Sequence, residues 1–112
     1  MTAEMDMHKS EQNIQNEIRL ALSKSGYVVF RVNSGKVKMQ DGRFFDTGVP
    51  NGFSDLMGFK EGGKIFFIEV KNEKGRVSEV QKRFLSAMKN KGAICGVARS
   101  VEEALKIVEG LQ

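Results

Sequence analysis

The segment from Lys64 to Lys71 limits what this 112-residue chain can fold into more than any other segment does. Its interior is apolar in nearly continuous order, interrupted only by Glu69, and consists of Ile65, Phe66, Phe67, Ile68 and Val70. A strand with one face in water would alternate apolar and polar residues, whereas a continuous apolar run is typical of a strand covered on both faces. The segment therefore predicts an internal strand of a sheet that has helices on its faces.

Helix signals occur at three places in the chain. Ser10 is a suitable N-cap for a helix, and Gly26 is a suitable stop. Ser78 marks a second helix start, and Ser100 with Glu103 forms a capping box for a third. The first helix carries an apolar stripe at helical spacing, formed by Ile14, Ile18, Ala21 and Leu22. The predicted helices run over about 10–25, 78–91 and 100–109.

Strand signals fill the intervals between these helices. Runs rich in β-branched and aromatic residues predict strands at 27–32, 53–59, 64–71 and 93–99. A hairpin is predicted at 36–40 and 43–46, around the turn Asp41-Gly42.

The element order αβ(ββ)ββαβα, without a repeat or an interdomain linker, predicts one mixed sheet flanked by helices. We expect an α/β (α+β) fold in a single domain over residues 1–112, with residues 1–9 as a mobile N-terminal tail.

Composition limits the possible classes of protein. Hydrophobic residues at 40% and charged residues at 29% are typical of a soluble globular chain, and no apolar run is long enough to span a bilayer. The first residues lack the basic start and apolar stretch of a secretory signal. Cys95 is the single cysteine and cannot form an internal disulfide. We therefore expect a cytoplasmic protein, in the host cell cytoplasm if the source is viral.

Possible metal ligands are restricted in type. With one cysteine and one histidine, the chain has no set of soft ligands for zinc, and His8 receives no role. A metal would be held mainly by oxygen, which favours Mg²⁺ or Mn²⁺. The region from Lys60 to Lys91 holds nine Lys or Arg residues against four Glu residues. Such a concentration of positive charge suits a phosphate backbone, although many soluble proteins carry similar charge without such a partner.

Asp55 and Glu69 belong to two strands that a Gly-rich turn joins. If that hairpin is symmetric, Asp55 lies opposite Ile68 and within one position of Glu69, so the two carboxylates meet across adjacent strands. Because side chains alternate, Glu69 and Lys71 share a face, and the backbone carbonyl of Val70 lies near the same edge. These oxygens suit a hard divalent cation that activates water, and Lys71 could orient or deprotonate that water.

These residues resemble the D…ExK core of the PD-(D/E)XK nucleases, and the wider pattern resembles the virus-type replication-repair nuclease (VRR-NUC) branch. The resemblance extends from about residue 10 to residue 104. Its motifs are Ser10-Glu11, Ile14-Gln15, 31–35 (RVNSG), 48–52 (GVPNG), Asp55-Leu56, 67–71 (FIEVK), Gly75, Ser78, Gln81 and Phe84.

The resemblance implies a restriction-endonuclease-like αβββαβ core and a metal-dependent nuclease. It implies that Asp55 and Glu69 are the principal metal ligands, with the Val70 carbonyl, and that Lys71 is the catalytic lysine. It further implies that Glu11 is a third carboxylate and that Gln81 supports the site. The family usually has proline before the aspartate, where this chain has Ser54. Glu17 is the alternative helix carboxylate, about two turns from Glu11.

Each of these residues also has an ordinary structural explanation. Glu69 and Lys71 could be charged residues at a strand end, and Gln81 could serve the capping box that Ser78 begins. Glu11 could simply favour the positive end of a helix. We expect Phe44, Phe45 and Phe53 to cover the core rather than to stack on bases. The residues predicted to contact nucleic acid are Arg31, Asn33, Lys36, Lys38, Lys74, Arg76 and Lys82.

The sequence favours a structure-selective, Mg²⁺- or Mn²⁺-dependent endodeoxyribonuclease. The stand-alone viral members that it resembles are similar to Holliday-junction resolvases, which implies a homodimer acting on branched DNA. Three alternatives stay open: a flap or gap nuclease with the same site, a non-catalytic nucleic-acid-binding module, and a sequence-specific restriction-type enzyme. The last would need base-reading elements for which 112 residues leave little room.

Overall fold

The computed structural model describes residues 9–111, so His8 and most of the predicted tail lie outside the described part. The helices are α1 (Glu11–Lys24), α2 (Glu79–Asn90) and α3 (Val101–Glu109), with a short 3-10 turn, η2 (Glu61–Gly63). The strands are β1 (Val28–Arg31), β2 (Lys36–Lys38), β3 (Phe44–Asp46), β4 (Leu56–Phe59), β5 (Ile65–Val70) and β6 (Ile94–Ala98). This order confirms the predicted αβ(ββ)ββαβα sequence of elements. Within residues 9–111, no helix is long and apolar enough to cross a membrane.

The main sheet is mixed and has the strand order β1-β4-β5-β6. β4 pairs antiparallel with both β1 and β5, while β5 pairs parallel with β6 through the crossover that contains α2. The predicted internal strand is confirmed, because β5 lies between two neighbours and is buried from Phe66 to Val70. The mixed α+β fold predicted from the sequence is therefore observed.

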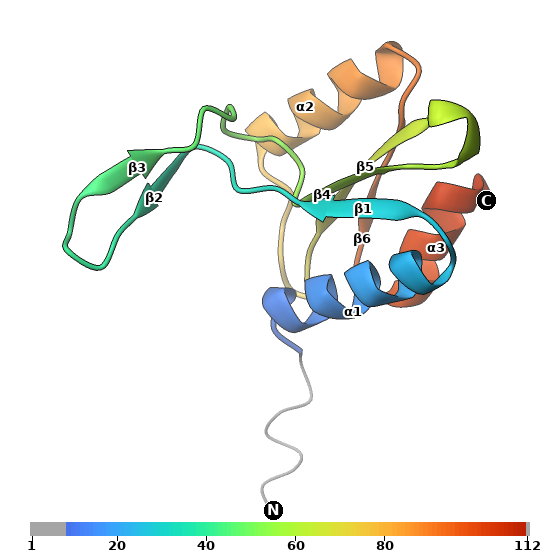
Figure 1. Ribbon diagram of the computed structural model, residues 1–112, viewed down its shortest axis with the longest axis horizontal. Coiled ribbons are helices and arrows are strands. Elements are labelled where there is room, and N and C mark those ends of the chain that lie inside the picture. Colours follow the sequence, from blue (N-terminus) through green and yellow to red (C-terminus); the bar gives the residue numbers. More distant parts are fainter. Residues whose placement is uncertain (1–8, 112) are drawn as a thin grey trace, which may run out of the picture.

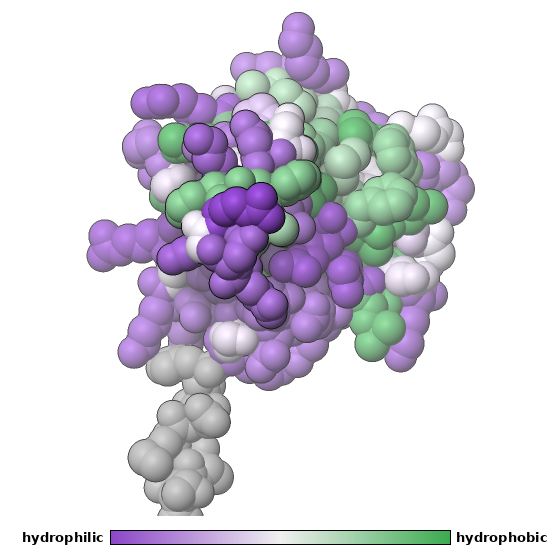
Figure 2. All heavy atoms as spheres, turned by 60° about the vertical axis from the view of Figure 1, so that its left-hand side comes forward, coloured by the Kyte–Doolittle hydropathy of each residue, from purple (hydrophilic) through white to green (hydrophobic). Residues whose placement is uncertain are grey.

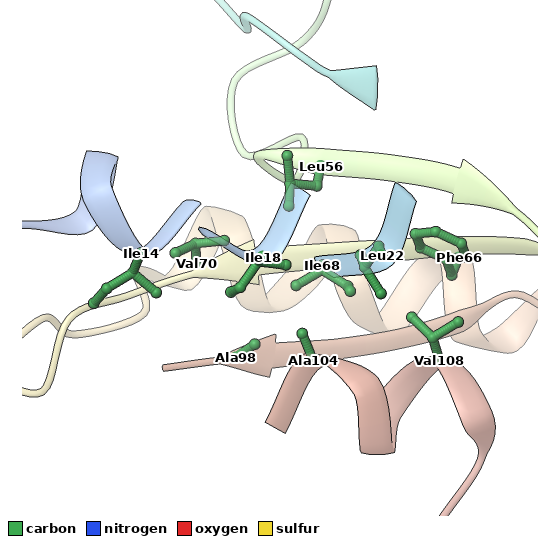
Figure 3. Close-up of a cluster of buried hydrophobic side chains, with 10 residues drawn as sticks. All are labelled: Ile14, Ile18, Leu22, Leu56, Phe66, Ile68, Val70, Ala98, Ala104 and Val108. Carbon is green, nitrogen blue, oxygen red and sulfur yellow. The ribbon is translucent and has the colours of Figure 1, made fainter. Parts of the chain in front are cut away.

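Helices cover both faces of this sheet (Figure 1). α1 and α3 lie on one face, where Ile18, Leu22 and Val108 pack on alternate residues of β5 (Figure 3). Complete burial of one such aliphatic side chain stabilises the fold by about 1.5–3 kcal/mol. α2 lies on the other face, where Phe84 contacts Phe67 edge to face. The two layers hold β5 in place from both sides.

The three predicted helix starts are confirmed by their caps. The hydroxyl groups of Ser10, Ser78 and Ser100 each accept a hydrogen bond from the backbone N–H three residues later. The predicted capping box at Ser100 is only half formed, because the Glu103 carboxylate accepts from the backbone N–H of Arg99.

The hairpin of β2 and β3 departs from the prediction that all strands join one sheet. These strands pair only with each other and form a separate two-stranded sheet, which projects from the body in Figure 1. The expectation that Phe44 and Phe45 cover the core is therefore wrong, since their residues are 64% and 57% exposed. Phe53 does pack inward, against Phe67 and Phe84.

Candidate active site

The β4–β5 hairpin brings Asp55 and Glu69 together. Leu56 pairs with Ile68 at the end of the ladder, so the next position places Asp55 beside Glu69. The symmetric turn expected from the sequence would pair Asp55 with Ile68, one residue away. The register differs because the connection from residue 60 to residue 64 includes η2, in which Gly62 and Gly63 adopt positive φ. The two carboxylates therefore meet without a bulge.

Backbone contacts fix Asp55 from both sides. Its Oδ2 accepts a hydrogen bond from the Val70 N–H at 2.9 Å, and its carbonyl accepts one from the Val32 N–H, also at 2.9 Å. In an extended strand the N–H and C=O of one residue point to the same side. The Val70 carbonyl therefore points toward the Asp55 side of β5, as a third metal ligand would require.

Glu69 is a buried carboxylate with one unsatisfied oxygen. Its residue is only 1% exposed, and Oε1 has no hydrogen-bond partner among the described residues. Burial, and after it the nearby negative charge of Asp55, raise the pKa of Glu69 to about 7 against the opposing charge of Lys71. A buried anion without compensation is costly, so a cation next to Oε1 would stabilise the ionised form.

Gln81 connects α2 to this carboxylate. Its Nε2 donates to Glu69 Oε2 at 2.5 Å, while its Oε1 accepts from the backbone N–H of Ser78. The backbone N–H of Gln81 donates in turn to the Ser78 hydroxyl, which completes the capping box. The capping explanation and the site explanation are thus compatible, because the two ends of one amide make the two contacts.

Lys71 follows β5 directly and lies at the same edge. Its Nζ is 3.7 Å from Glu69 Oε2, and its backbone N–H donates to the Ala98 carbonyl on β6. Burial also raises the pKa of Asp55, while the Val70 N–H and the Lys71 charge lower it. The lysine is therefore held close enough to act on a group bound at the two carboxylates.

Glu11 borders the site from the first residue of α1. A Cβ built on Gly75 would lie 2.5 Å from Glu11 Oε2 and 3.2 Å from Lys71 Cδ, so both side chains approach this glycine. The charge of Glu11 also raises the pKa of Asp55. Glu17 instead forms an exposed ion pair with Lys9 at 2.8 Å. These contacts favour Glu11 over Glu17 as the helix carboxylate of the site.

Arg99 is a site-forming residue that sequence reasoning missed. Its Nη1 donates to the backbone carbonyls of Asn72 and Gly75, at 2.5 and 2.8 Å. It thereby anchors the turn that follows Lys71, within which the Asn72 side chain accepts from the Gly75 N–H. Contacts between a side chain and backbone carbonyls more than twenty residues away leave no recognisable pattern of residue types in the sequence. The position of Arg99 just after β6 was a possible signal of its role.

The arrangement can accommodate a hard cation with two side chains and one backbone oxygen. Among residues 9–111, no three His, Cys, Asp or Glu side chains cluster in a way that suits a metal ion. The oxygens that could hold such a cation are those of the Asp55 and Glu69 carboxylates and the Val70 carbonyl, and their role as ligands stays a prediction, as does the inclusion of Glu11. The unpartnered Glu69 Oε1 fits a cation of the Mg²⁺ or Mn²⁺ type.

Ser54 explains how the chain manages without the proline that the family usually has before the aspartate. The residue is 1% exposed, and its hydroxyl donates to the Leu56 carbonyl at 2.8 Å. This local hydrogen bond satisfies the buried hydroxyl and holds the turn into β4. The difference therefore affects the loop before Asp55 and leaves the carboxylate contacts in place.

The residues predicted to contact nucleic acid are all exposed and lie on three segments around the site. One segment runs from the last residue of β1 through β2, one follows β5, and one is the first turn of α2; the residues are Arg31, Asn33, Lys36, Lys38, Lys74, Arg76 and Lys82. Their exposure agrees with the prediction but equally suits solvated surface charge, so their role stays a prediction.

The fold and the acidic, lysine-containing strand end define a nuclease-type αβ domain. The family model for the VRR-NUC domain matches residues 9–102, and the chain belongs to that family. A solved structure described as a VRR_NUC domain superposes with a TM-score of 0.64 over 90% of this chain and 97% of that one, at 22% identity. A comparison with curated protein sequences finds no match.

Proposed function

We propose that this chain is a metal-dependent endodeoxyribonuclease that hydrolyses phosphodiester bonds in branched DNA, in the manner of a Holliday-junction resolvase. The observation that carries the proposal is the pairing of Asp55 with Glu69 at one sheet edge, with Lys71 Nζ 3.7 Å from Glu69. Membership of the VRR-NUC family supports a nuclease rather than a binding module.

Asp55, Glu69 and the Val70 carbonyl would hold Mg²⁺ or Mn²⁺, with Glu11 at the border of the site. The chemistry that such a cation supplies is charge stabilisation at phosphate and acidification of water. Gln81 holds Glu69 Oε2 in place, which leaves Oε1 available as a ligand. Outer contacts of this kind orient the ligands they touch.

Lys71 is the residue that acts on the reacting water and the phosphate. Its ammonium group can donate hydrogen bonds to the water or to a non-bridging phosphate oxygen, which aligns them for attack. Water adds to phosphorus and one ester P–O bond breaks, leaving a phosphomonoester and a hydroxyl group. The turn held by Arg99 fixes the start of the lysine side chain for this step.

We propose that the chain acts as a homodimer, which would let two sites cut opposing strands. The support is an apolar area on the β1–β4 half of the sheet, formed by Val28, Phe30 and Phe59. Val28 pairs with Phe59, so these side chains share one face, and α2 packs over β5 and β6 instead. Figure 2 shows hydrophobic surface to the right of the projecting hairpin. Exposed apolar patches commonly mark protein interfaces.

The experiment that tests this function is cleavage of labelled four-way junction, flap and linear duplex DNA with Mg²⁺ or Mn²⁺. The wild-type chain is compared with Asp55→Ala and Lys71→Ala, and Lys106→Ala on α3 is the matched control. We expect paired, symmetric junction cuts that fall by at least about 100-fold in both site variants and are unchanged in the control.

The substrate that is cut separates the alternatives. Single cuts in flap DNA would replace the resolvase with a flap-type nuclease that uses the same residues. Salt-sensitive binding without cleavage of any substrate would contradict the enzyme and favour a non-catalytic module.

A further inference from the structure

The β2–β3 hairpin, residues 36–46, forms an arm that leaves its apolar side chains exposed. Both strands are exposed along their whole length, and the arm stands clear of the helices and the main sheet (Figure 1). An isolated two-stranded hairpin is marginally stable in water, and Phe44 and Phe45 stay 64% and 57% exposed on this one. The arm therefore offers apolar side chains that a binding partner could cover.

The two sides of the arm have different chemistry. Val37 and Phe45 are cross-strand partners and share one side, which Met39 continues by strand alternation. The opposite side carries Lys36 and Lys38 together with their cross-strand partners, Asp46 and Phe44. One side thus offers an apolar ridge, and the other offers two ammonium groups.

The acidic residues of the arm are engaged locally, while its lysines are not. Asp41 accepts from the Nε and backbone N–H of Arg43 at the tip, and Asp46 accepts from the Gly48 N–H. Within residues 9–111, neither Lys36 nor Lys38 takes part in an ion pair. In Figure 2, which brings the arm toward the reader, strongly hydrophilic and hydrophobic side chains lie directly beside one another. This mixture suits a polyanion that also presents flat apolar surfaces.

The base of the arm is joined firmly to the loop that carries Asp55. The Thr47 hydroxyl donates to the Gly35 carbonyl at 2.8 Å, and the Gly35 N–H donates to the Val49 carbonyl at 2.7 Å. The Asn51 side chain fills the space where Gly35 would carry a Cβ. The arm is therefore anchored at its base to the same segment of chain that continues to Asp55.

Resting on the proposed nuclease function, we infer that the arm binds DNA next to the cleaved phosphate, with Phe45 inserted into a base step and Lys36 and Lys38 on the backbone. A two-stranded ribbon fits the major groove of DNA, and apolar side chains can enter between unstacked bases. Opening a base step costs free energy, and the cost is lower at a branch, where the bases are less fully stacked and paired than in an intact duplex. The arm would thus select branched DNA by its deformability.

The test uses the full chain in EDTA with a four-way junction that carries 2-aminopurine at the branch. Unstacking raises the fluorescence of this base, so binding and insertion are read without cleavage. We expect a fluorescence increase with the wild-type chain, lost in Phe45→Ala, together with roughly 5- to 150-fold weaker binding. Leu20→Ala, at another exposed apolar position on α1, should behave as wild type.

A second variant reports from the protein side. The chain contains no tryptophan, so Phe45→Trp introduces a single indole whose emission should be quenched by stacking when the junction binds. Unchanged fluorescence and affinity in Phe45→Ala would overturn the inference. The inference would also be overturned if Phe45→Ala lost the dimer in sedimentation but kept the 2-aminopurine signal. The arm would then bind a second copy of the chain.

The same measurement separates this inference from the proposed function. A Phe45-dependent signal from a chain that cuts no DNA would support the arm and contradict the nuclease. Normal cleavage with no effect of Phe45→Ala would support the nuclease and contradict the arm.

Discussion

Glu69 is the residue whose chemistry depends most on its surroundings. Its burial in the metal-free protein raises its pKa to about 7, from an ordinary value of 4.5. The folded state therefore binds more protons than the unfolded state between these two values. Stability from this residue is fully present below pH 4.5 and is lost as the pH rises through 7.

We accordingly predict that the free energy of unfolding of the metal-free protein decreases by on the order of 3 kcal/mol across this interval as Glu69 ionises beside Asp55. Denaturant unfolding of the wild type and of Glu69→Gln, followed from pH 4.5 to pH 8, measures this difference. The variant should lack the decrease, because its amide does not ionise. Parallel curves for the two proteins would show that Glu69 does not titrate in this range.

Arg99 gives a second test at the scale of single residues. Its guanidinium group donates to both the Asn72 and the Gly75 carbonyls. In Arg99→Lys the single ammonium group cannot reproduce this planar arrangement of donors. We expect a 10- to 100-fold lower cleavage rate, roughly the effect of displacing a catalytic group by about 1 Å. KM should change little, because Arg99 positions Lys71 and does not bind the substrate.

The matched control for this variant is Arg19→Lys on α1. An unchanged kcat in Arg99→Lys, with an unchanged melting temperature, would contradict the positioning role of this residue.

The positions of the candidate site residues at one sheet edge were largely predictable, whereas the supporting contacts were not. Asp55, Glu69 and Lys71 follow from strand alternation and from a hairpin that joins consecutive strands. Gln81 was predictable as part of a capping box, but its contact with Glu69 requires the packing of α2 on the sheet. Arg99 was missed because its partners are backbone carbonyls, which every residue possesses.

At the scale of elements, apolar periodicity and caps predicted every helix and strand, and the errors concern turns and burial. β4 begins at Leu56 rather than at residue 53, because the Ser54 hydroxyl bonds locally to the Leu56 carbonyl. The arm was predicted as a hairpin, but its separation from the sheet was not. Aromatic residues are usually buried where a hydrophobic core is within reach. The sequence does not reveal that Phe44 and Phe45 lie too far from the core to be buried in it.

At the scale of the whole molecule, the exposed face of β1 and β4 is the surface on which the proposed dimer depends. Phe30 is 52% exposed and lies on the same face as the Val28 and Phe59 pair, two positions further along β1. Phe30→Glu places a charge in this apolar area. We expect it to shift the chain from dimer to monomer in sedimentation and to turn paired junction cuts into single cuts.

Leu111→Glu changes a similarly exposed apolar residue near the C-terminal end and should leave the dimer intact. A Phe30→Glu variant that stays dimeric would move the interface away from this face. The proposed nuclease site would not be affected by that result, because Asp55 and Glu69 lie within one chain.

The most direct test of the central claim is the single-turnover cleavage rate as a function of Mg²⁺ concentration, for the wild type, Glu69→Gln and the control Glu102→Gln. We predict no cleavage in EDTA and a saturable increase of the rate with Mg²⁺. The rate should be at least about 100-fold lower in Glu69→Gln and unchanged in the control. Cleavage by the wild type in EDTA, or a wild-type rate in Glu69→Gln, would contradict the assignment of Asp55 and Glu69 as the metal-binding centre.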